Sequence, residues 1–380
     1  MGAGGRPLWQ RIRPHVMVFD IPLTIIIVML LSVGLVTLYS AGMAIPGRVN
    51  DQLRNIVVAF LVMWMAANIP PAMLQRLAAP AYVLAVALLV VVALFGTING
   101  GSRRWITIGI QLQPSEFMKI AMPLMLAWFF QRQAGYMRWP VYALAALLLV
   151  IPVGLIARQP DLGTALLVVA TGACVIFLAG LSWKALAALA VLACASLPVM
   201  WPFLHDYQRE RVLTLIDPYH DPLGKGFHII QSTIAIGSGG AAGKGWTHGT
   251  QTHLEFLPER TTDFIFAVFS EEFGLAGNLV LMVLYLLLIW RGLAIASRAP
   301  TLFTRLLAGA MTMIYFTYAF VNMGMVSGIV PVVGVPLPFM SYGGTALLTL
   351  GLGAGILMSI EHHSRKVRGG SGMQTWSLPA

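Results

Sequence analysis

Charged side chains are scarce in this chain. Only 10% of its 380 residues are Asp, Glu, Lys or Arg, whereas 58% are hydrophobic, and the mean hydropathy is +0.80. A water-soluble domain of this length needs a far more charged surface, so the composition excludes a soluble globular protein. Cysteine is rare as well. Cys174 and Cys194 lie in apolar runs, without the spacing of a disulfide framework or of a metal site.

Long apolar runs are abundant instead. A helix needs about 20 apolar residues to cross the hydrocarbon core, and the sequence offers about ten such runs. They lie near 21–40, 53–69, 77–95, 115–131, 140–157, 162–180, 184–203, 263–290, 306–327 and 341–360. We therefore predict an all-α integral membrane protein, a polytopic bundle of about ten transmembrane helices that forms a single domain over residues 1–380.

The basic residues predict the orientation of this bundle. With ten spans, 13 of the 24 basic residues fall in short segments on the side of the N-terminus, and only five fall in the short loops opposite. The positive-inside rule then places both termini in the cytoplasm. The net charge of +10 is explained by topology, and no nucleic-acid partner is needed. Residues 204–262 become one long extracytoplasmic loop, and residues 365–380 a cytoplasmic tail.

Acidic residues are concentrated in one region. Of 14 in the chain, nine lie between Asp206 and Glu272, in the long loop and the helix that follows it. In the segment PERTTDFIFAVFSEEFG, residues 258–273, Asp263 begins a predicted span. Glu271 lies about 12 Å further along on roughly the same face. An ionised carboxylate at that depth needs a partner, a water-filled cavity or a bound proton.

Further charged residues lie at other predicted helix ends on the outer side. In QPSEFMK, Ser115 is a candidate cap, and Glu116 and Lys119 are three residues apart on one helix face. A purely structural ion pair is the alternative reading of these two. Asp161 begins the span after ARQPDLGT, and GSRRWITIG contributes Arg103 and Arg104. Cations and carboxylates thus meet at the outer membrane edge, where ionisable residues are candidates for function.

Three uncharged or glycine-rich segments complete this side. AIGSGGAAGKGWTHG, residues 235–249, is not a phosphate loop, because Ser238 and Gly245 stand where that motif needs Gly and Ser or Thr. We predict a flexible outer loop, with Lys244 as an anion contact. FHIIQSTIAIG favours an interfacial helix, and GIVPVVGVPLPFMSYGGT a rigid turn that faces protein or a cavity. The histidines show no zinc-site spacing.

Five segments carry a resemblance to a known family. They are QPSEFMK, ARQPDLGTALL, IDPYHDPLGKGFHIIQSTIAIGSGG, LPERTTDFIFAVFSEEFG and GVPLPFMSYGGT. In this order and spacing they resemble the SEDS family of bacterial membrane proteins, over about residues 20–362. HDYQRERV and KGWTHGTQTHLEFLPERTTDF resemble the elongation members of that family more than its division members. The ten predicted spans agree with the ten helices of the family.

The resemblance implies a function. It implies a peptidoglycan glycosyltransferase that polymerises lipid II into glycan strands at the outer face of the bacterial cytoplasmic (inner) membrane. The implied partners are lipid II, the nascent glycan strand, membrane lipid, a class B penicillin-binding protein that crosslinks the strands, and the elongation machinery. The essential aspartate of the family falls on Asp263.

Chemistry assigns roles to the charged residues. Asp263 is the candidate general base that accepts the proton of the attacking GlcNAc 4-hydroxyl. Undecaprenyl pyrophosphate is the leaving group, and its developing charge calls for cations or a divalent metal. Mg²⁺ or Mn²⁺ is compatible with this, although the sequence shows no ligand set. The substrate-binding candidates are Lys119, Glu116, Arg103, Arg104, Asp161, Arg209, Arg211, Lys244, Glu259 and Arg260.

Other functions remain open from the sequence. A flippase that moves lipid II across the membrane would also use many helices and inner polar residues, and Glu271 and Glu272 lean slightly that way. A division-specific polymerase is a second alternative. A structural scaffold for the penicillin-binding partner is a third, but it does not explain a buried Lys119.

Overall fold

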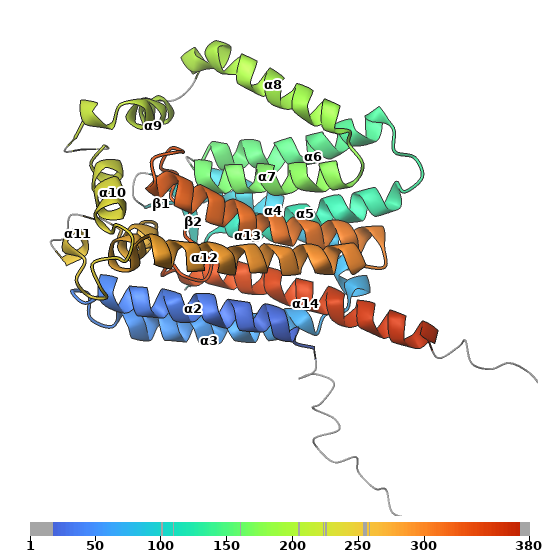
Figure 1. Cartoon of the computed structure of the whole chain (residues 1–380). Helices are drawn as coiled ribbons and strands as arrows, with labels where there is room; N and C mark the ends of the chain where they lie inside the picture. Colours follow the sequence, from blue (N-terminus) through green and yellow to red (C-terminus); the bar gives the residue numbers. More distant parts are fainter. Residues whose placement is uncertain are drawn as a thin grey trace, which may run out of the picture.

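The computed structural model describes residues 18–372, except 100–101, 109, 160, 204–205, 223, 225, 254–256 and 258. Long helices lie roughly side by side in one bundle (Figure 1). A helix lies at each of the ten predicted ranges: α2 (Ile21–Ala41), α3 (Arg48–Ala67), α4 (Pro71–Phe95), α5 (Pro114–Arg132), α6 (Trp139–Ala157), α7 (Leu162–Leu178), α8 (Trp183–Met200), α12 (Ile265–Arg298), α13 (Leu302–Val326) and α14 (Gly344–Gly372).

Six of these helices are long and apolar enough to cross a membrane. They are α2, α4, α6, α12, α13 and α14. The crossing of the remaining four predicted spans, and the cytoplasmic location of both termini, stay predictions. The central helix is α13, which packs on α12, α7 and α5. Tyr315 and Tyr318 of α13 are fully buried, so this helix forms the middle of the core rather than a lipid-facing wall.

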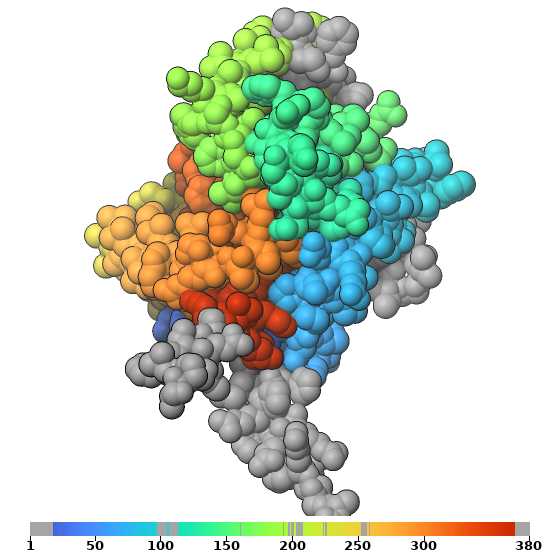
Figure 2. Space-filling model, turned by 90° about the vertical axis from the view of Figure 1, so that its right-hand side faces the viewer, coloured from blue at the N-terminus to red at the C-terminus, as the bar shows by residue number. Residues whose placement is uncertain are grey.

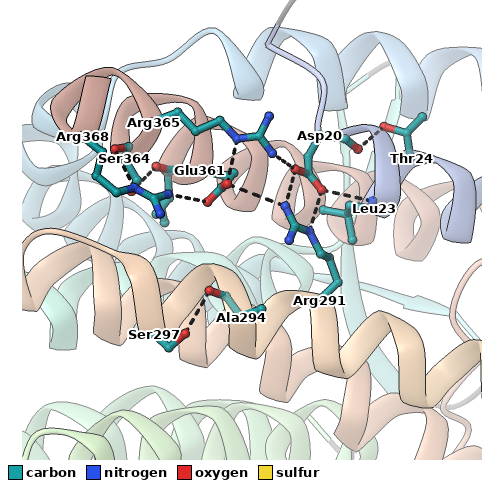
Figure 3. A network of polar contacts seen from close by, with 11 residues as sticks. Asp20, Leu23, Thr24, Arg291, Ala294, Ser297, Glu361, Ser364, Arg365 and Arg368 are labelled. Carbon is teal, nitrogen blue, oxygen red and sulfur yellow. Dashed lines mark hydrogen bonds and ion pairs between the residues drawn. The ribbon is translucent and has the colours of Figure 1, made fainter. Parts of the chain in front are cut away.

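Buried ion pairs join three helices at the end of the bundle opposite the long loop. Arg291 of α12 donates to both carboxylate oxygens of Asp20, at 2.8 and 2.6 Å. Arg365 of α14 bridges Asp20, at 2.7 Å, and Glu361, at 2.8 Å (Figure 3). Asp20 also caps α2 through the main-chain N–H of Leu23. This network fixes the ends of α2, α12 and α14 to one another.

Ends of several helices lie together at this same end of the bundle. Figure 2 shows the end of α12 and the start of α13 (orange), the end of α14 (red) and the start of α4 (blue) on one face. The contact between red and blue is polar as well as apolar, because the hydroxyl of Ser359 donates to the main-chain carbonyl of Ile69. Charged and uncharged contacts therefore both tie this end together.

A small sheet departs from the purely helical prediction. Between α4 and α5 the chain forms β1 (Thr97–Asn99), β2 (Ser102–Ile108) and β3 (Ile110–Leu112), paired antiparallel in that order. The register sets Ile98 opposite Arg103 and Thr107 opposite Gln111. Alternating Ile and Thr residues in this short stretch favour strands over helix. The fold is thus a helical bundle with a short β-connection between α4 and α5.

The long loop is itself largely helical. It contains α9 (Asp206–Ile216), η2 (Pro218–His220), α10 (Phe227–Ser238) and α11 (Thr250–His253), and η1 (Trp201–Phe203) directly precedes it. α10, the expected interfacial helix, lies against α12 and α13. Its buried Ser232 donates to the main-chain carbonyl of Val326, at 2.9 Å. The helix is therefore part of the protein core at this end.

The glycine-rich segment interrupts α12. Gly274 has φ 63° and ψ −160° within the helix, a region open essentially to glycine alone. The freed N–H groups of Leu275 and Ala276 donate to Gly240 and Ala241, and the carbonyls of Glu271 and Glu272 accept from Lys244 and Gly245. The expectation of a flexible loop is wrong here, because four main-chain hydrogen bonds hold this segment in the break.

Candidate active site

The chain around Asp263 is held by main-chain hydrogen bonds. The side-chain amide of Asn322 on α13 donates to the carbonyl of Asp263 at 2.8 Å and to that of Val335 at 2.7 Å. On the neighbouring residue, the hydroxyl of Ser341 donates to the carbonyl of Thr262 at 2.6 Å. Asp263 lies two residues before α12, so its backbone is fixed by α13 and by the segment 331–343 rather than by helix geometry.

The carboxyl group of Asp263 faces the proline- and glycine-rich segment. Gly334 has φ +71°, and a Cβ there would lie 3.3 Å from Oδ2 of Asp263. In the described part of the chain this carboxyl group makes no hydrogen bond or ion pair. Burial and, to a lesser extent, the negative charge of Glu259 together raise the pKa of Asp263 to about 6. A carboxylate with this pKa is suited to accept a proton near neutral pH.

Glu259 and Arg260 flank the turn that leads to Asp263. Glu259 is exposed and has φ +52°, and its carbonyl accepts from the N–H groups of Thr262 and Phe264. Its carboxylate accepts from the hydroxyl of Thr262 at 2.8 Å. Arg260 is buried, and its Nε donates to the carbonyl of Ala41 at 2.9 Å. Arg260 thereby fixes the turn to the end of α2.

A second polar cluster surrounds Lys119. Its Nζ lies 2.5 Å from Oε1 of Glu116 and 2.5 Å from the hydroxyl of Tyr318. Thr349 of α14 donates to the other oxygen of Glu116 at 3.2 Å. Lys119 is only 3% exposed. Tyr318 precedes Asn322 by four residues on α13, so one face of that helix contacts both Lys119 and the backbone of Asp263.

Asp161 forms a third part of the same region. Its Oδ1 accepts from the N–H of Thr164 and caps α7, and its Oδ2 accepts from Gln113 at 2.9 Å. The hydroxyl of Ser115 also points to Asp161, at 3.4 Å, so the predicted capping of α5 by Ser115 is wrong. A Cβ at Gly163 would lie 2.6 Å from the carbonyl of Val333. The segment 331–343 therefore lies between the start of α7 and Asp263.

The other predicted residues lie elsewhere or are engaged locally. Lys244 pairs with Glu271 at 2.7 Å beside the break in α12, where Thr250 also binds that carboxylate. Arg209 donates to the carbonyls of Trp201 and Pro202, so it secures the start of α9. Arg211 lines a cavity next to α10. Arg103 and Arg104 lie on β2, and their side chains lie outside the described part of the structure.

One expectation about this region is corrected by the geometry. Asp263 does not share a helix face with Glu271, because α12 begins only at Ile265. The ammonium group of Lys244 pairs with the carboxylate of Glu271, and its role as a contact to a substrate anion stays a prediction. Among the described residues, no group of three or more His, Cys, Asp or Glu side chains is arranged to hold a metal ion, and no residue is assigned to Mg²⁺ or Mn²⁺.

Comparison with known proteins places these motifs in a family. Residues 21–366 match the cell cycle protein family of FtsW, RodA and SpoVE. The chain belongs to this family, the SEDS family. It is 49% identical to the peptidoglycan glycosyltransferase MrdB of Escherichia coli K12, over 95% of this chain and 96% of that protein. It is 34% identical to the stage V sporulation protein E of Bacillus subtilis, over 91% and 98%.

Solved structures of relatives share the fold. One relative is a chain of a peptidoglycan synthase complex that coordinates polymerization and crosslinking. It is 36% identical, with a TM-score of 0.79 over 91% of this chain and 98% of that one. The rod shape determining protein RodA of Thermus thermophilus is 30% identical, with a TM-score of 0.69 over 91% and 97%. The FtsW of Haemophilus influenzae is 32% identical, less than MrdB, which agrees with the resemblance to elongation members.

Sequence reasoning missed several residues of this SEDS site. Asn322 and Tyr318 lie in an apolar span, where a polar side chain is itself a signal of function or buried contact. Gln113 stands beside the QPSEFMK motif, and its partner Asp161 is 48 residues away. The histidines were considered only as zinc ligands, yet the ring of His228 stacks on that of Phe264, with centroids 5.6 Å apart. Only the fold brings these residues to the predicted ones.

Proposed function

We propose that this chain polymerises lipid II into glycan strands at the outer face of the bacterial cytoplasmic membrane during cell elongation, with Asp263 as the general base. The observation that carries the proposal is the carboxyl group of Asp263. Asp263 is partly buried with its carboxylate beside Gly334, its backbone is fixed by Asn322, and its pKa is raised to about 6. The names of the MrdB relatives as peptidoglycan glycosyltransferases support the same activity.

The reaction needs one proton acceptor. The 4-hydroxyl of the GlcNAc unit of incoming lipid II attacks the anomeric carbon of the strand, whose bond to undecaprenyl pyrophosphate breaks. Asp263 takes the hydroxyl proton as the new glycosidic bond forms, and such assistance contributes about 10² to 10⁴ in rate. A single displacement converts the α-linked donor into a β-linked product.

The departing pyrophosphate needs positive charge. Lys119 is the favoured cation, because α13 contacts Lys119 through Tyr318 and the backbone of Asp263 through Asn322. Arg260 is the second, because it lies three residues before the base and is buried beside α2. Arg103, Arg104, Arg209, Arg211 and Lys244 stay weaker candidates. Mg²⁺ or Mn²⁺ would supply the same charge compensation when bound.

The location of the site suits lipid-linked substrates. Both substrates carry polyprenyl tails, so the reacting groups must lie just outside the bilayer while the tails stay within it. Asp263, Asp161 and Glu116 all stand at or before the first turn of a helix, as a site at the membrane edge requires. A class B penicillin-binding protein is the proposed partner, since a similar chain occurs in a peptidoglycan synthase complex.

A lipid II flippase is the second candidate function. The broken helix α12, with Glu271 and Glu272 buried beside the break, is the observation that favours it, because interrupted helices with polar groups are typical of transporters. Polymerisation by detergent-solubilised protein separates the two functions, since a flippase has no second side to act on in detergent. Polymer formation under these conditions supports the polymerase.

Replacement of the base tests the proposal directly. Purified Asp263→Asn protein in detergent is expected to make no glycan polymer from lipid II, while it keeps the wild-type elution volume and thermal stability. Asp51→Asn, which changes an exposed aspartate of α3, is the matched control and should polymerise normally. Polymerisation by Asp263→Asn at a near wild-type rate would show that Asp263 is not the base.

A further inference from the structure

Two cavities lie next to each other between α9 and α10 in the long loop. The first, with a volume of about 560 Å³, is lined by Arg211 and His228 among others. The second, about 660 Å³, includes Leu213 and Ile216 in its walls. Thr214 and Asp221 line both, so the two cavities adjoin each other at these residues. We refer to it as the α9–α10 groove.

One end of the α9–α10 groove reaches the candidate base. His228 stacks on Phe264, with ring centroids 5.6 Å apart and an interplanar angle of 19°, and Phe264 directly follows Asp263. Val332 forms another wall of the first cavity. It lies two residues before Gly334, which approaches the carboxylate of Asp263. Through His228 and Val332, one end of the groove therefore lies near the chain segments that carry Asp263 and Gly334, and the groove continues along α9.

The charges along the groove do not suit the pyrophosphate. Among the described residues that line it, Glu210, Asp217 and Asp221 carry carboxylates and Arg211 carries a guanidinium. An excess of carboxylates repels an anion. The buried Lys119 lies in a different cluster, with Glu116 and Tyr318. The diphosphate and the groove are thus separate parts of the surface around Asp263.

Uncharged sugar rings fit the lining better. Carboxylates accept hydrogen bonds from hydroxyl groups, a threonine hydroxyl both donates and accepts, and a neutral imidazole offers one donor and one acceptor. Burial lowers the pKa of His228, although the charge of Glu259 acts in the opposite direction, and the lower pKa favours the neutral ring. Ile229 and Val332 add apolar wall, which matches the C–H faces of a pyranose.

We propose that the α9–α10 groove binds the sugar rings of the growing glycan strand next to Asp263. This inference rests on the proposed function and extends it, because it assigns the strand, rather than the incoming lipid II, to the long loop. A strand held in the groove stays bound between successive additions. The groove therefore sets how many sugars are added before the strand is released.

Blocking the shared point of the two cavities tests this inference. Thr214→Trp fills the groove where both cavities meet, whereas Val212→Trp places the same bulk on α9 at a residue that lines neither cavity. With purified lipid II in detergent, Thr214→Trp is expected to release strands roughly tenfold sooner than wild type, the equivalent of about 1.4 kcal/mol of binding. Gel analysis of polymer length measures this, and Val212→Trp should give wild-type lengths.

A direct binding measurement provides a readout that does not depend on turnover. A lipid-free GlcNAc–MurNAc tetrasaccharide is the probe, observed by saturation-transfer NMR with wild-type protein and with Thr214→Trp. Binding to wild type alone supports the groove as the strand site. Equal polymer lengths for all three proteins, or equal tetrasaccharide binding by wild type and Thr214→Trp, overturns it. If wild-type protein makes no polymer at all, the proposed function fails instead, which is a distinct outcome.

Discussion

The side-chain amide of Asn322 holds the main-chain carbonyl of Asp263 at 2.8 Å. One helical turn earlier on α13, the hydroxyl of Tyr318 lies 2.5 Å from the ammonium group of Lys119. Asn322 is fully buried, so both contacts are made in the protein interior. The candidate base and the favoured cation are therefore positioned by the same rigid helix, which restricts how far either can move relative to the other.

The raised pKa of Asp263 predicts the pH profile of the reaction. A general base must be ionised, so kcat/KM for lipid II should rise with pH and level off above about 6. Burial is the main cause of this raised pKa, and the negative charge of Glu259 is the second. Glu259→Gln should therefore shift the acidic limb to lower pH without loss of the plateau rate. Initial rates measured between about pH 5 and pH 8, a range that brackets the pKa of about 6, test both statements.

Thermal stability provides the control for this profile. A carboxyl group whose pKa is higher in the folded than in the unfolded state stabilises the fold in its protonated form. That contribution is fully present below the ordinary value of 3.8 and is lost as the pH rises through about 6. Asp263→Asn stays neutral, so it should be at least as stable as wild type above that pH. A marked loss of stability in this variant would contradict the inference that burial disfavours the ionised form of Asp263.

The pair of Lys119 and Glu116 predicts a separation of stability from activity. Lys119→Met leaves the carboxylate of Glu116 without its 2.5 Å partner and should cost about 3 to 5 kcal/mol of unfolding free energy. Adding Glu116→Gln removes the unpaired charge and should restore much of that stability. If Lys119 compensates the pyrophosphate, the double variant stays inactive. Recovery of polymerisation together with stability would assign the pair a structural role alone.

The sequence was most informative about features that depend on local patterns along the chain. Apolar runs long enough to span a bilayer predict helices, and a helix lies at each predicted range. The concentration of acids between Asp206 and Glu272 pointed to the region that contains Asp263. Both signals depend only on the order of residues along the chain.

Contacts between distant segments could not be predicted in this way. Lys244 was predicted as an anion contact from its place in a glycine-rich loop. In the structure the backbone conformation of Gly274 interrupts α12, and Lys244 in the glycine-rich segment beside this break pairs with Glu271. Ser115 has the residue type and position of a cap, yet its hydroxyl faces Asp161 across 46 residues. Such pairings depend on how helices pack, which no local pattern encodes. The stacking of His228 on Phe264 belongs to the same class.

Gly274 predicts a local loss of stability when a side chain is introduced. Its φ of 63° and ψ of −160° cost an L-residue about 1 to 3 kcal/mol, and a Cβ would lie 2.3 Å from the main-chain nitrogen of Gly243. Gly274→Ala should therefore lower the unfolding temperature and expose the segment 239–245 to proteolysis. Gly237→Ala in α10, where a Cβ would meet no atom within 4 Å, should be neutral or stabilising. Equal effects of the two substitutions would contradict the tight insertion of the segment into α12.

The ion network at the opposite end predicts that burial, rather than the number of contacts, decides the contribution of an arginine. Arg291 and Arg365 both bind Asp20 and both approach Glu361, but their side chains are 9% and 53% exposed. Arg291→Met leaves a buried carboxylate short of its main partner and should cost about 3 kcal/mol or more. Arg365→Met removes contacts that water can replace, and should cost about 1 kcal/mol or less.

Thermal unfolding in detergent at low and high salt measures both costs. Salt should weaken only the contribution of Arg365, because buried pairs are poorly screened. A larger loss of stability for Arg365→Met than for Arg291→Met would show that the exposed arginine contributes more than the buried one.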